Sequence, residues 1–233
     1  MYSELIEVRD EEVDGETNWM WIKDCDGSFY GSFHHWRDCH KEKYFKHIEK
    51  FDTIVTAGTN CGMYARLYAK MFKHVYAFEP EPLAFYCMTN NAPYDNVIKL
   101  NAALGDGHGI VGINRATAGK GASRDMMNAG MNTIAPADEK FQIPMMTIDS
   151  LCLNACDMIQ LDVEGFEQFA IRGALATIKK FKPVIIAERF NTHEHQVAMK
   201  QINYILVDIS SADAIYVHED RLNKSDEEFI YTT

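Results

Sequence analysis

The feature that most constrains the fold is a glycine-bounded turn that joins a strand pattern to a helical pattern. Asp52–Ala57 (DTIVTA) is typical of a buried strand, Gly58-Thr-Asn-Cys-Gly62 forms the turn, and Met63–Phe72 follows as a helix. A second apolar strand, Val75–Phe78, comes soon afterwards. Strand, helix and strand with such short connections predict a parallel pair with a right-handed crossover.

The same alternation continues along most of the chain. Further strands are expected at Val97–Leu104, Met158–Val163, Val184–Ala187, Tyr204–Ile209 and Ala214–Val217, and further helices at Arg37–Lys50, Leu83–Asn91, Phe166–Phe181 and His193–Asn203. Glycines crowd residues 105–135, where we expect loops and a hairpin. The pattern predicts an α/β fold with a doubly wound, Rossmann-like sheet that is mostly parallel and has an antiparallel C-terminal strand.

No repeat and no linker rich in Pro, Gly or Ser divides the chain. We therefore expect an N-terminal segment, residues 1–50, that contains one helix and serves as a lid or a packing extension. Residues 51–233 are expected to form a single globular domain, and 233 residues in all suffice for one large α/β core.

The charge balance narrows the choice of partners. Lys and Arg total 23 against 34 Asp and Glu, a net charge of −11, and no basic run is present, so nucleic acid is not an expected partner. No stretch is long and apolar enough for a bilayer, and the acidic N-terminus is unlike a signal peptide. We expect a cytoplasmic protein with no membrane contact and with free cysteines; its oligomeric state is left open.

The turn and the second strand together indicate a nucleotide site. Glycines at a strand-to-helix turn let backbone N–H groups approach a ligand closely, although a tight turn alone also requires glycine. Glu79 follows the second strand, about 20 residues beyond the turn, where doubly wound folds place a carboxylate on the ribose diol. A G-x-G-x-x-G fingerprint and a P-loop lysine are both missing, which favours a cofactor without phosphates, S-adenosylmethionine (SAM).

Several ordered motifs resemble those of the FkbM-type SAM-dependent methyltransferases, from about Phe51 to about Val217. They are Gly58-Thr-Asn-Cys-Gly62, Phe78-Glu-Pro-Glu-Pro82, Asn101-Ala-Ala-Leu104, Pro144-Met-Met-Thr-Ile-Asp-Ser-Leu151, Leu161-Asp-Val-Glu-Gly-Phe-Glu167 and Pro183-Val-Ile-Ile-Ala-Glu188. The resemblance implies the sheet of a class I methyltransferase.

The resemblance and the turn together assign a set of cofactor-binding residues. They are Thr56, Gly58, Thr59, Asn60, Gly62, Glu79, Pro80, Asn101, Ala102 and Asp162. Two positions depart from the family pattern: Thr56 stands where an acid is usual, and Gln160 where Lys is usual. Because a hydroxyl supplies no charge to an ammonium group, either SAM affinity is reduced or another carboxylate substitutes.

Three carboxylates are the expected catalytic residues. Asp162 and Glu164 follow one central strand and Glu188 ends the next, and carboxyl ends of parallel strands open into the binding crevice. Mutual repulsion can raise one pKa and produce a general base. Asp162 is assigned to the cofactor or acceptor side, and Glu164 or Glu188 to the base.

Other readings of these carboxylates remain open. Glu164 can cap the next helix, Glu188 can pair with Arg189 or Arg172, and the cluster can bind a divalent metal, although no metal site is assigned. The segment with Lys120, Ser123 and Arg124 is read as an acceptor-side loop or a mobile hairpin.

The predicted function is O-methylation of a hydroxyl on a saccharide or another small molecule, the O-methyl preference being implied by the resemblance. A non-catalytic SAM-binding or sensing module is the alternative, motivated by Thr56. A nicotinamide-dependent oxidoreductase is disfavoured by the missing fingerprint.

Overall fold

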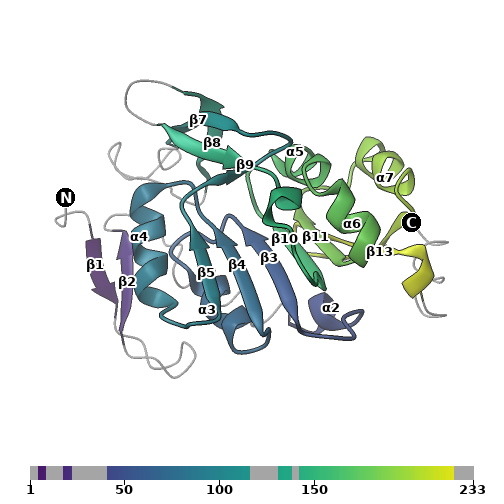
Figure 1. The fold of residues 1–233 in the computed structure, drawn as a ribbon, viewed down its shortest axis with the longest axis horizontal. Coiled ribbons are helices and arrows are strands. Elements are labelled where there is room, and N and C mark those ends of the chain that lie inside the picture. Colours follow the sequence, from purple (N-terminus) through teal and green to yellow (C-terminus); the bar gives the residue numbers. More distant parts are fainter. Residues whose placement is uncertain (1–4, 9–17, 23–40, 116–130, 138–141, 223–233) are drawn as a thin grey trace.

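The computed structural model describes residues 5–8, 18–22, 41–115, 131–137 and 142–222 (Figure 1). Its strands are β1 (Leu5–Val8), β2 (Trp19–Ile22), β3 (Thr53–Ala57), β4 (His74–Phe78), β5 (Val97–Leu100), β6 (Ala103–Leu104), β7 (Gly109–Asn114), β8 (Thr133–Pro136), β9 (Ile143–Met146), β10 (Met158–Leu161), β11 (Val184–Glu188), β12 (Tyr204–Ser210) and β13 (Asp213–His218). Its helices are α2 (Lys41–Phe45), α3 (Met63–Ala69), α4 (Pro82–Asn91), α5 (Glu167–Arg172), α6 (Leu175–Phe181) and α7 (His193–Lys200), with 3-10 turns η4 (Ile148–Leu151) and η5 (Glu219–Arg221).

A seven-stranded sheet organises the chain, with the strand order β12-β13-β11-β10-β3-β4-β5. β3 pairs in parallel with β4 and β10, and β10 with β11, whereas β13 runs antiparallel to both of its neighbours. Every residue of β3 and β10 is buried, as expected of central parallel strands. The predicted fold, a mostly parallel sheet with an antiparallel C-terminal strand, is confirmed.

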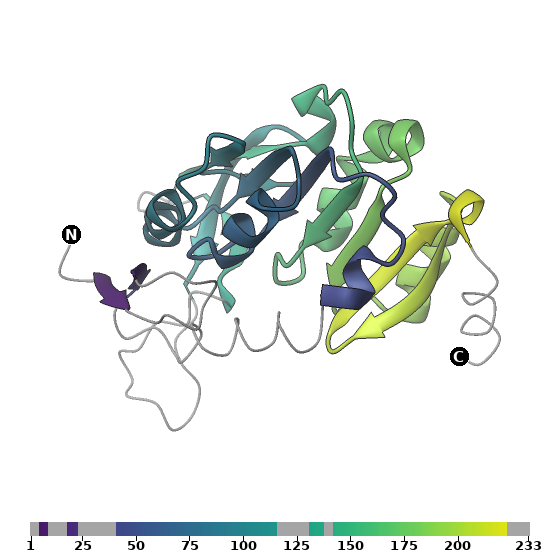
Figure 2. The ribbon, with the colours of Figure 1, turned by 90° about the horizontal axis from the view of Figure 1, so that it is seen from below.

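Helices cover both faces of this sheet (Figure 2). Residues of α5, α6 and α7 pack in one apolar cluster with Val55 and Ala57, and residues of α2, α3 and α4 pack in another with Ile54. Because side chains alternate along a strand, one short strand supplies both clusters. In the part of the chain that the structure describes, no helix has the length and apolarity needed to cross a membrane.

The glycine-rich region contributes to a second, four-stranded sheet of order β6-β9-β7-β8. β7 and β8 pair antiparallel as a hairpin, as predicted, and β9 joins them from a segment for which no strand was predicted. This small sheet lies over the carboxyl ends of the central strands (Figure 1). It thereby encloses the region that the sequence assigns to ligand binding.

Two predicted elements are each divided in the structure. The strand expected at Val97–Leu104 is split at Asn101 into β5 and β6, which belong to different sheets. The helix expected at Phe166–Phe181 is interrupted at Gly173-Ala174. A Cβ at Gly173 would lie 2.0 Å from the carbonyl oxygen of Gly105, so the interruption brings two backbones into close contact.

The N-terminal region is only partly described. Of the helix expected at Arg37–Lys50, residues 37–40 lie outside the described chain and α2 ends at Phe45. Tyr44 and Ile48 are buried. β1 and β2 form an antiparallel hairpin that was not predicted. β2 packs on α4, where the Asn91 side chain exchanges hydrogen bonds of 2.7 Å with the Met20 backbone. Whether residues 1–50 act as a lid stays a prediction.

Candidate active site

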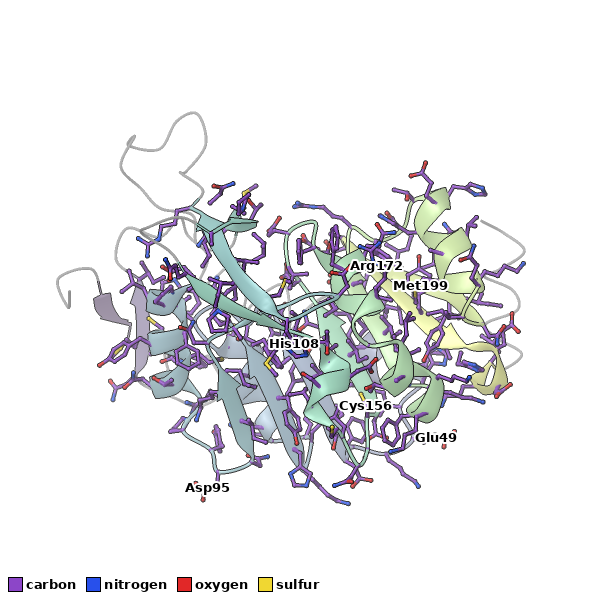
Figure 3. The ribbon with its side chains drawn as sticks, turned by 45° about the horizontal axis from the view of Figure 1, so that its top comes forward. Glu49, Asp95, His108, Cys156, Arg172 and Met199 are labelled. Atoms are coloured by element: carbon purple, nitrogen blue, oxygen red, sulfur yellow. The ribbon has the colours of Figure 1, made fainter. Side chains whose placement is uncertain are left out.

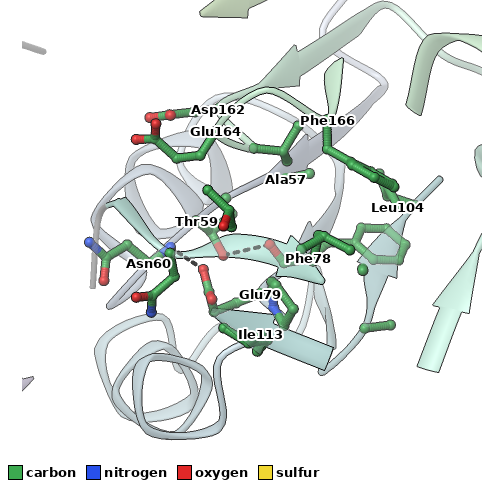
Figure 4. A pocket seen from close by; sticks show the side chains of 18 of the residues that line it. Ala57, Thr59, Asn60, Phe78, Glu79, Leu104, Ile113, Asp162, Glu164 and Phe166 are labelled. Carbon is green, nitrogen blue, oxygen red and sulfur yellow. Dashed lines mark hydrogen bonds between the residues drawn. The ribbon is translucent and has the colours of Figure 1, made fainter. Parts of the chain in front are cut away.

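A cavity of about 220 Å³ lies at the carboxyl ends of β3, β4 and β10 (Figure 4). Residues that follow these strands form its polar side, and Phe78, Leu104 and Ile113 are among its apolar lining residues. Nine of the predicted site residues line it: Gly58, Thr59, Asn60, Glu79, Pro80, Ala102, Asp162, Glu164 and Glu188. The structure therefore gathers most of the predicted site in one place.

The turn after β3 brings the backbone of Gly58 close to the backbone of Asp162. Gly58 has a φ of +74°, and a Cβ added to it would lie 1.7 Å from the carbonyl oxygen of Asp162. Glycine is thus required both by the backbone conformation and by the neighbouring strand. The N–H of Gly58 donates to Phe78 O (3.1 Å), and the Thr59 hydroxyl donates to the same oxygen (3.2 Å; Figure 4).

Asn60 links the turn to the second strand. It adopts the left-handed conformation, with a φ of +49°, and its backbone N–H donates to Glu79 Oε2 at 2.7 Å. Its side-chain Oδ1 is buried without a hydrogen-bond partner among the described residues. A buried acceptor of this kind at a cavity wall is available to a ligand donor.

Glu79 is a buried carboxylate with defined contacts. Its Oε1 accepts a hydrogen bond from the Glu81 N–H (2.9 Å), and the carbonyl oxygen of Glu79 accepts one from Asn101 Nδ2 (2.8 Å). Burial raises the pKa of Glu79 to about 7, although the two backbone donors, Glu81 and Asn60, act in the opposite direction. Each carboxylate oxygen retains acceptor capacity beyond its backbone bond.

We expect the ligand-free protein to lose stability as the pH rises from about 4.5 to about 7, because the folded pKa of Glu79 exceeds its ordinary value of 4.5. The contribution of Glu79 is fully present below the lower pKa and is lost as the pH passes the higher one. Denaturant unfolding at about pH 5.5 and pH 8 measures this slope. Glu79→Gln should flatten it, whereas Glu49→Gln, at an exposed carboxylate, should not; equal slopes in all three proteins would contradict the assignment.

Three predicted cofactor-binding residues, Thr56, Gly62 and Asn101, do not line the cavity. Asn101 holds the turn after β4, and Gly62 precedes α3 with a φ of +91°, where a Cβ would lie 2.7 Å from the Cα of Met88. Both residues thus support the site from outside it.

Thr56 is fully buried within the sheet, and its hydroxyl donates to Gln160 Oε1 on the adjacent strand. Alternation along β3 and β10 places this pair on the face of Ile54 and Met158, away from that of Ala57 and Leu161. The two departures from the family pattern are therefore neighbours that bond to each other.

The three predicted catalytic carboxylates form one cluster. Asp162, Glu164 and Glu188 each offer an oxygen within 4.8 Å of the others. Burial, followed by the charges of Glu188, Asp213 and Glu164, raises the pKa of Asp162 well above its usual range. The pKa of Glu164 is also raised, first by burial and then by Glu188, whereas Arg189 lowers it.

The alternative roles of these carboxylates are partly resolved. Glu188 pairs with Arg189 (3.4 Å), whereas Arg172 pairs with Asp106 (2.8 Å). Glu164 does not cap α5; the side chain of Glu167 accepts the Val163 and Gly165 N–H groups instead, at 3.2 and 3.3 Å. The spacing of the cluster remains compatible with a divalent ion, although acidic groups commonly gather without one.

Sequence reasoning missed the cavity residues that lie far along the chain. Ile113 of β7 and Ile134 of β8 line the cavity, and no local motif marks them. Their position depends on the small sheet, which was not fully predicted. The proposed acceptor-side residues Lys120, Ser123 and Arg124 lie outside the described residues.

The sheet order, the reversed strand β13 and a cavity bounded by the turn after β3 and the carboxylate after β4 define a fold of the SAM-dependent methyltransferase class. The chain belongs to the family of the methyltransferase FkbM domain, which matches residues 54–216. The family assignment and the predicted fold class are thereby confirmed.

One solved structure supports the fold. A methyltransferase FkbM from Methylobacillus flagellatus is 14% identical, with a TM-score of 0.50 over 76% of this chain. The match spans 50% of that protein's length. A SAM-dependent methyltransferase from Aquifex aeolicus is also 14% identical, with a TM-score of 0.41, and the match covers 79% of this chain and 92% of that one. No curated protein sequence matches the chain.

The residues around the cavity fit SAM on two observations. Asn60 Oδ1 is a buried acceptor without a hydrogen-bond partner among the described residues, and Glu79 is a buried carboxylate with spare lone pairs. The nearby acidic cluster complements a cationic group. A ribose diol and a positively charged end are the features of SAM that these groups can bind.

Proposed function

We propose that this protein is a SAM-dependent methyltransferase that methylates a hydroxyl oxygen of a saccharide or another small molecule. The observation that carries the proposal is the meeting of Asp162, Glu164 and Glu188 at the cavity that also contains the glycine turn and Glu79. Cofactor-binding groups and candidate bases thus share one enclosed space, as an in-line displacement requires.

On the cofactor side, Glu79 would accept hydrogen bonds from the ribose hydroxyls, and Asn60 Oδ1 would accept one from a ligand donor. Because Thr56 is bonded to Gln160 and faces away from the cavity, we assign the ammonium-binding role to Asp162. SAM, when bound, supplies a methyl carbon activated by its sulfonium charge.

On the acceptor side, we assign the base to Glu164. Oxygens of Asp162, Glu164 and Glu188 lie within 4.8 Å of one another, and the charges of Glu188 and Glu164 contribute to raising the pKa of Asp162. Glu164 lies beside the Arg189 guanidinium (3.4 Å), which stabilises its ionised form. Glu164 would therefore accept the hydroxyl proton, and its raised pKa makes it a stronger base than an exposed carboxylate.

The experiment combines cofactor binding with methyl transfer. Calorimetry with S-adenosylhomocysteine (SAH) should detect binding, and methyl-labelled SAM should transfer label to hydroxyls in a panel of neutral glycosides and polyols. Glu164→Gln should retain SAH binding. Its rate of label transfer should fall by about 100-fold or more, the usual contribution of a general base. Glu49→Gln, at an exposed site, is the matched control. Absence of SAH binding would overturn the proposal.

The alternative, a non-catalytic SAM-binding module, is favoured by one observation. The positions where the family pattern has an acid and a lysine form the neutral pair Thr56 and Gln160. This alternative predicts SAH binding without label transfer to any acceptor in the panel, whereas the proposed methyltransferase requires transfer to at least one.

A further inference from the structure

A second cavity, of about 290 Å³, lies beside the first and shares Glu164 and Glu188 with it. Its other lining residues come from the start of α5, the segment after β11 and the first turn of α7. The two cavities therefore meet at two of the carboxylates proposed to act in catalysis. A group held in the second cavity has direct access to those carboxylates.

The second cavity contains a cation that bridges the shared carboxylates. Arg189 Nη1 lies 3.4 Å from Glu164 Oε2, and Nη2 lies 3.4 Å from Glu188 Oε1. The Arg189 side chain is nonetheless 65% exposed, whereas the carboxylates are 14% and 15% exposed. The guanidinium thus has donors left for a ligand while it fixes the two acids.

An aromatic pair with a free ring nitrogen forms another part of the lining. The rings of Phe190 and His195 stack with centroids 3.9 Å apart and an angle of 11° between their planes. The Nδ1 atom of His195 is buried and has no hydrogen-bond partner in the described parts of the chain. A buried imidazole nitrogen of this kind calls for a polar partner, which a bound ligand can supply.

Two of the seven non-glycine residues with a positive φ in the described parts of the chain line this cavity. Glu164 and Arg189 both adopt the left-handed conformation, with φ of +49° and +50°. For residues other than glycine this conformation is energetically unfavourable. The N–H of Arg189 donates to Ala212 O at 2.7 Å, which helps to hold the strained conformation. Strain that the surrounding fold maintains is characteristic of functional sites.

We propose that the second cavity is the acceptor subsite and that it takes a single, neutral, polyhydroxylated ring whose hydroxyls are bound by Arg189 and His195; this rests on the proposed methyltransferase function. The volume is at the lower limit of ligand pockets, about 300 Å³, which suits one ring. The lining contains three glutamates and one arginine, so its net negative charge disfavours a phosphorylated or carboxylated acceptor. The glutamates would also hold an amine as its ammonium ion, which has no lone pair for attack.

The test uses SAH-saturated protein and two probes: methyl α-glucopyranoside and its 6-phosphate. NMR follows the imidazole signals, with that of His195 assigned by its loss in His195→Gln. The neutral glycoside should shift the His195 signal in a saturable manner, and the 6-phosphate should bind at least tenfold more weakly. Lack of a glycoside-induced shift, or equal binding of the phosphate, would overturn the subsite.

Variants separate ligand recognition from folding. Arg189→Ala should weaken glycoside binding at least tenfold, Arg189→Lys should restore part of it, and both should bind SAH within about twofold of wild type. His74→Gln, at an exposed site at the start of β4, is the matched control for His195→Gln. Calorimetry measures glycoside binding to the variants, because His195→Gln lacks the reporting NMR signal. Unchanged glycoside binding in both Arg189→Ala and His195→Gln would refute the proposal. Failure of wild-type protein to bind SAH would instead refute the proposed function.

Discussion

Replacing Glu79 with alanine is expected to weaken SAH binding by roughly 10- to 150-fold. A hydrogen bond to a charged group contributes about 1.5–3 kcal/mol, and 1.4 kcal/mol corresponds to a tenfold change in Kd. Glu79 lies at the cavity, accepts two backbone N–H groups and has acceptor capacity left for a ribose diol. Isothermal titration calorimetry with SAH at about pH 8, where Glu79 is mainly ionised, measures the effect.

The controls for Glu79 separate ligand binding from support of the turn. Glu79→Gln retains the shape and one acceptor oxygen, so its affinity should fall between those of wild type and Glu79→Ala. Glu49→Gln, at an exposed site near the opposite end of the sheet, should bind SAH as wild type does (Figure 3). Circular dichroism should confirm that each variant is folded. An unchanged affinity in folded Glu79→Ala would remove Glu79 from the cofactor site.

Gly58→Ala is expected to destabilise the fold by roughly 2–5 kcal/mol and to abolish measurable SAH binding. The estimate adds about 1–2 kcal/mol for a left-handed residue with a side chain to about 1–3 kcal/mol for overpacking. The Cβ would lie 1.7 Å from the Asp162 carbonyl oxygen, and that backbone is held by the N–H of Asp162 donating to Ala57 O at 3.1 Å. Relief of the collision therefore requires separation of β3 from the end of β10.

Two other glycines provide matched controls for Gly58. Gly165 has a φ of +91° but open space around an added Cβ, so Gly165→Ala should cost only the conformational part, about 1–2 kcal/mol. Gly107 has open space and no positive φ, so Gly107→Ala should change stability by about 0.5 kcal/mol or less. Denaturant unfolding measures all three variants. If Gly58→Ala lowers the free energy of unfolding by no more than Gly165→Ala does, the close contact with the Asp162 backbone does not require glycine at position 58.

Local patterns in the sequence predicted the central part of the fold. The apolar runs that became β3, β10 and β11 are buried strands in a parallel sheet, because both of their faces are covered by helices. The strand ends placed Glu79, Asp162 and Glu188 at one edge, because parallel strands place their carboxyl ends together. Nine predicted site residues line one cavity for this reason.

Where prediction failed, long-range contacts were responsible. One apolar stretch became β5 and β6 because Asn101 turns the chain and bonds to the carbonyl oxygens of Glu79 and Pro80. The helix after β10 is broken at Gly173, where the backbone of Gly105 passes too close for any side chain. Neither contact can be read from local periodicity, since each joins segments that are distant along the chain.

The motif of residues 144–151, which contains Asp149, illustrates the same limit. The sequence marks it only as part of a family pattern, whereas the structure shows Asp149 accepting hydrogen bonds from the N–H groups of Ala176 and Thr177, at 2.9 and 2.7 Å. Asp149 therefore supports the first turn of α6 from a distant segment. Its role is structural, which no spacing within the motif indicates.

The sequence by itself determined the class of fold, the strand that runs against the others, the glycine turn and the edge of the sheet at which the acidic residues gather. These follow from hydrophobic periodicity and from the geometry of parallel strands, which are local properties. Only the tertiary structure decided that Thr56 bonds to Gln160 away from the cavity and that Arg189 joins Glu164 to Glu188. It also decided that a second cavity opens beside the first, because side-chain direction and pairing between segments depend on how the whole chain packs.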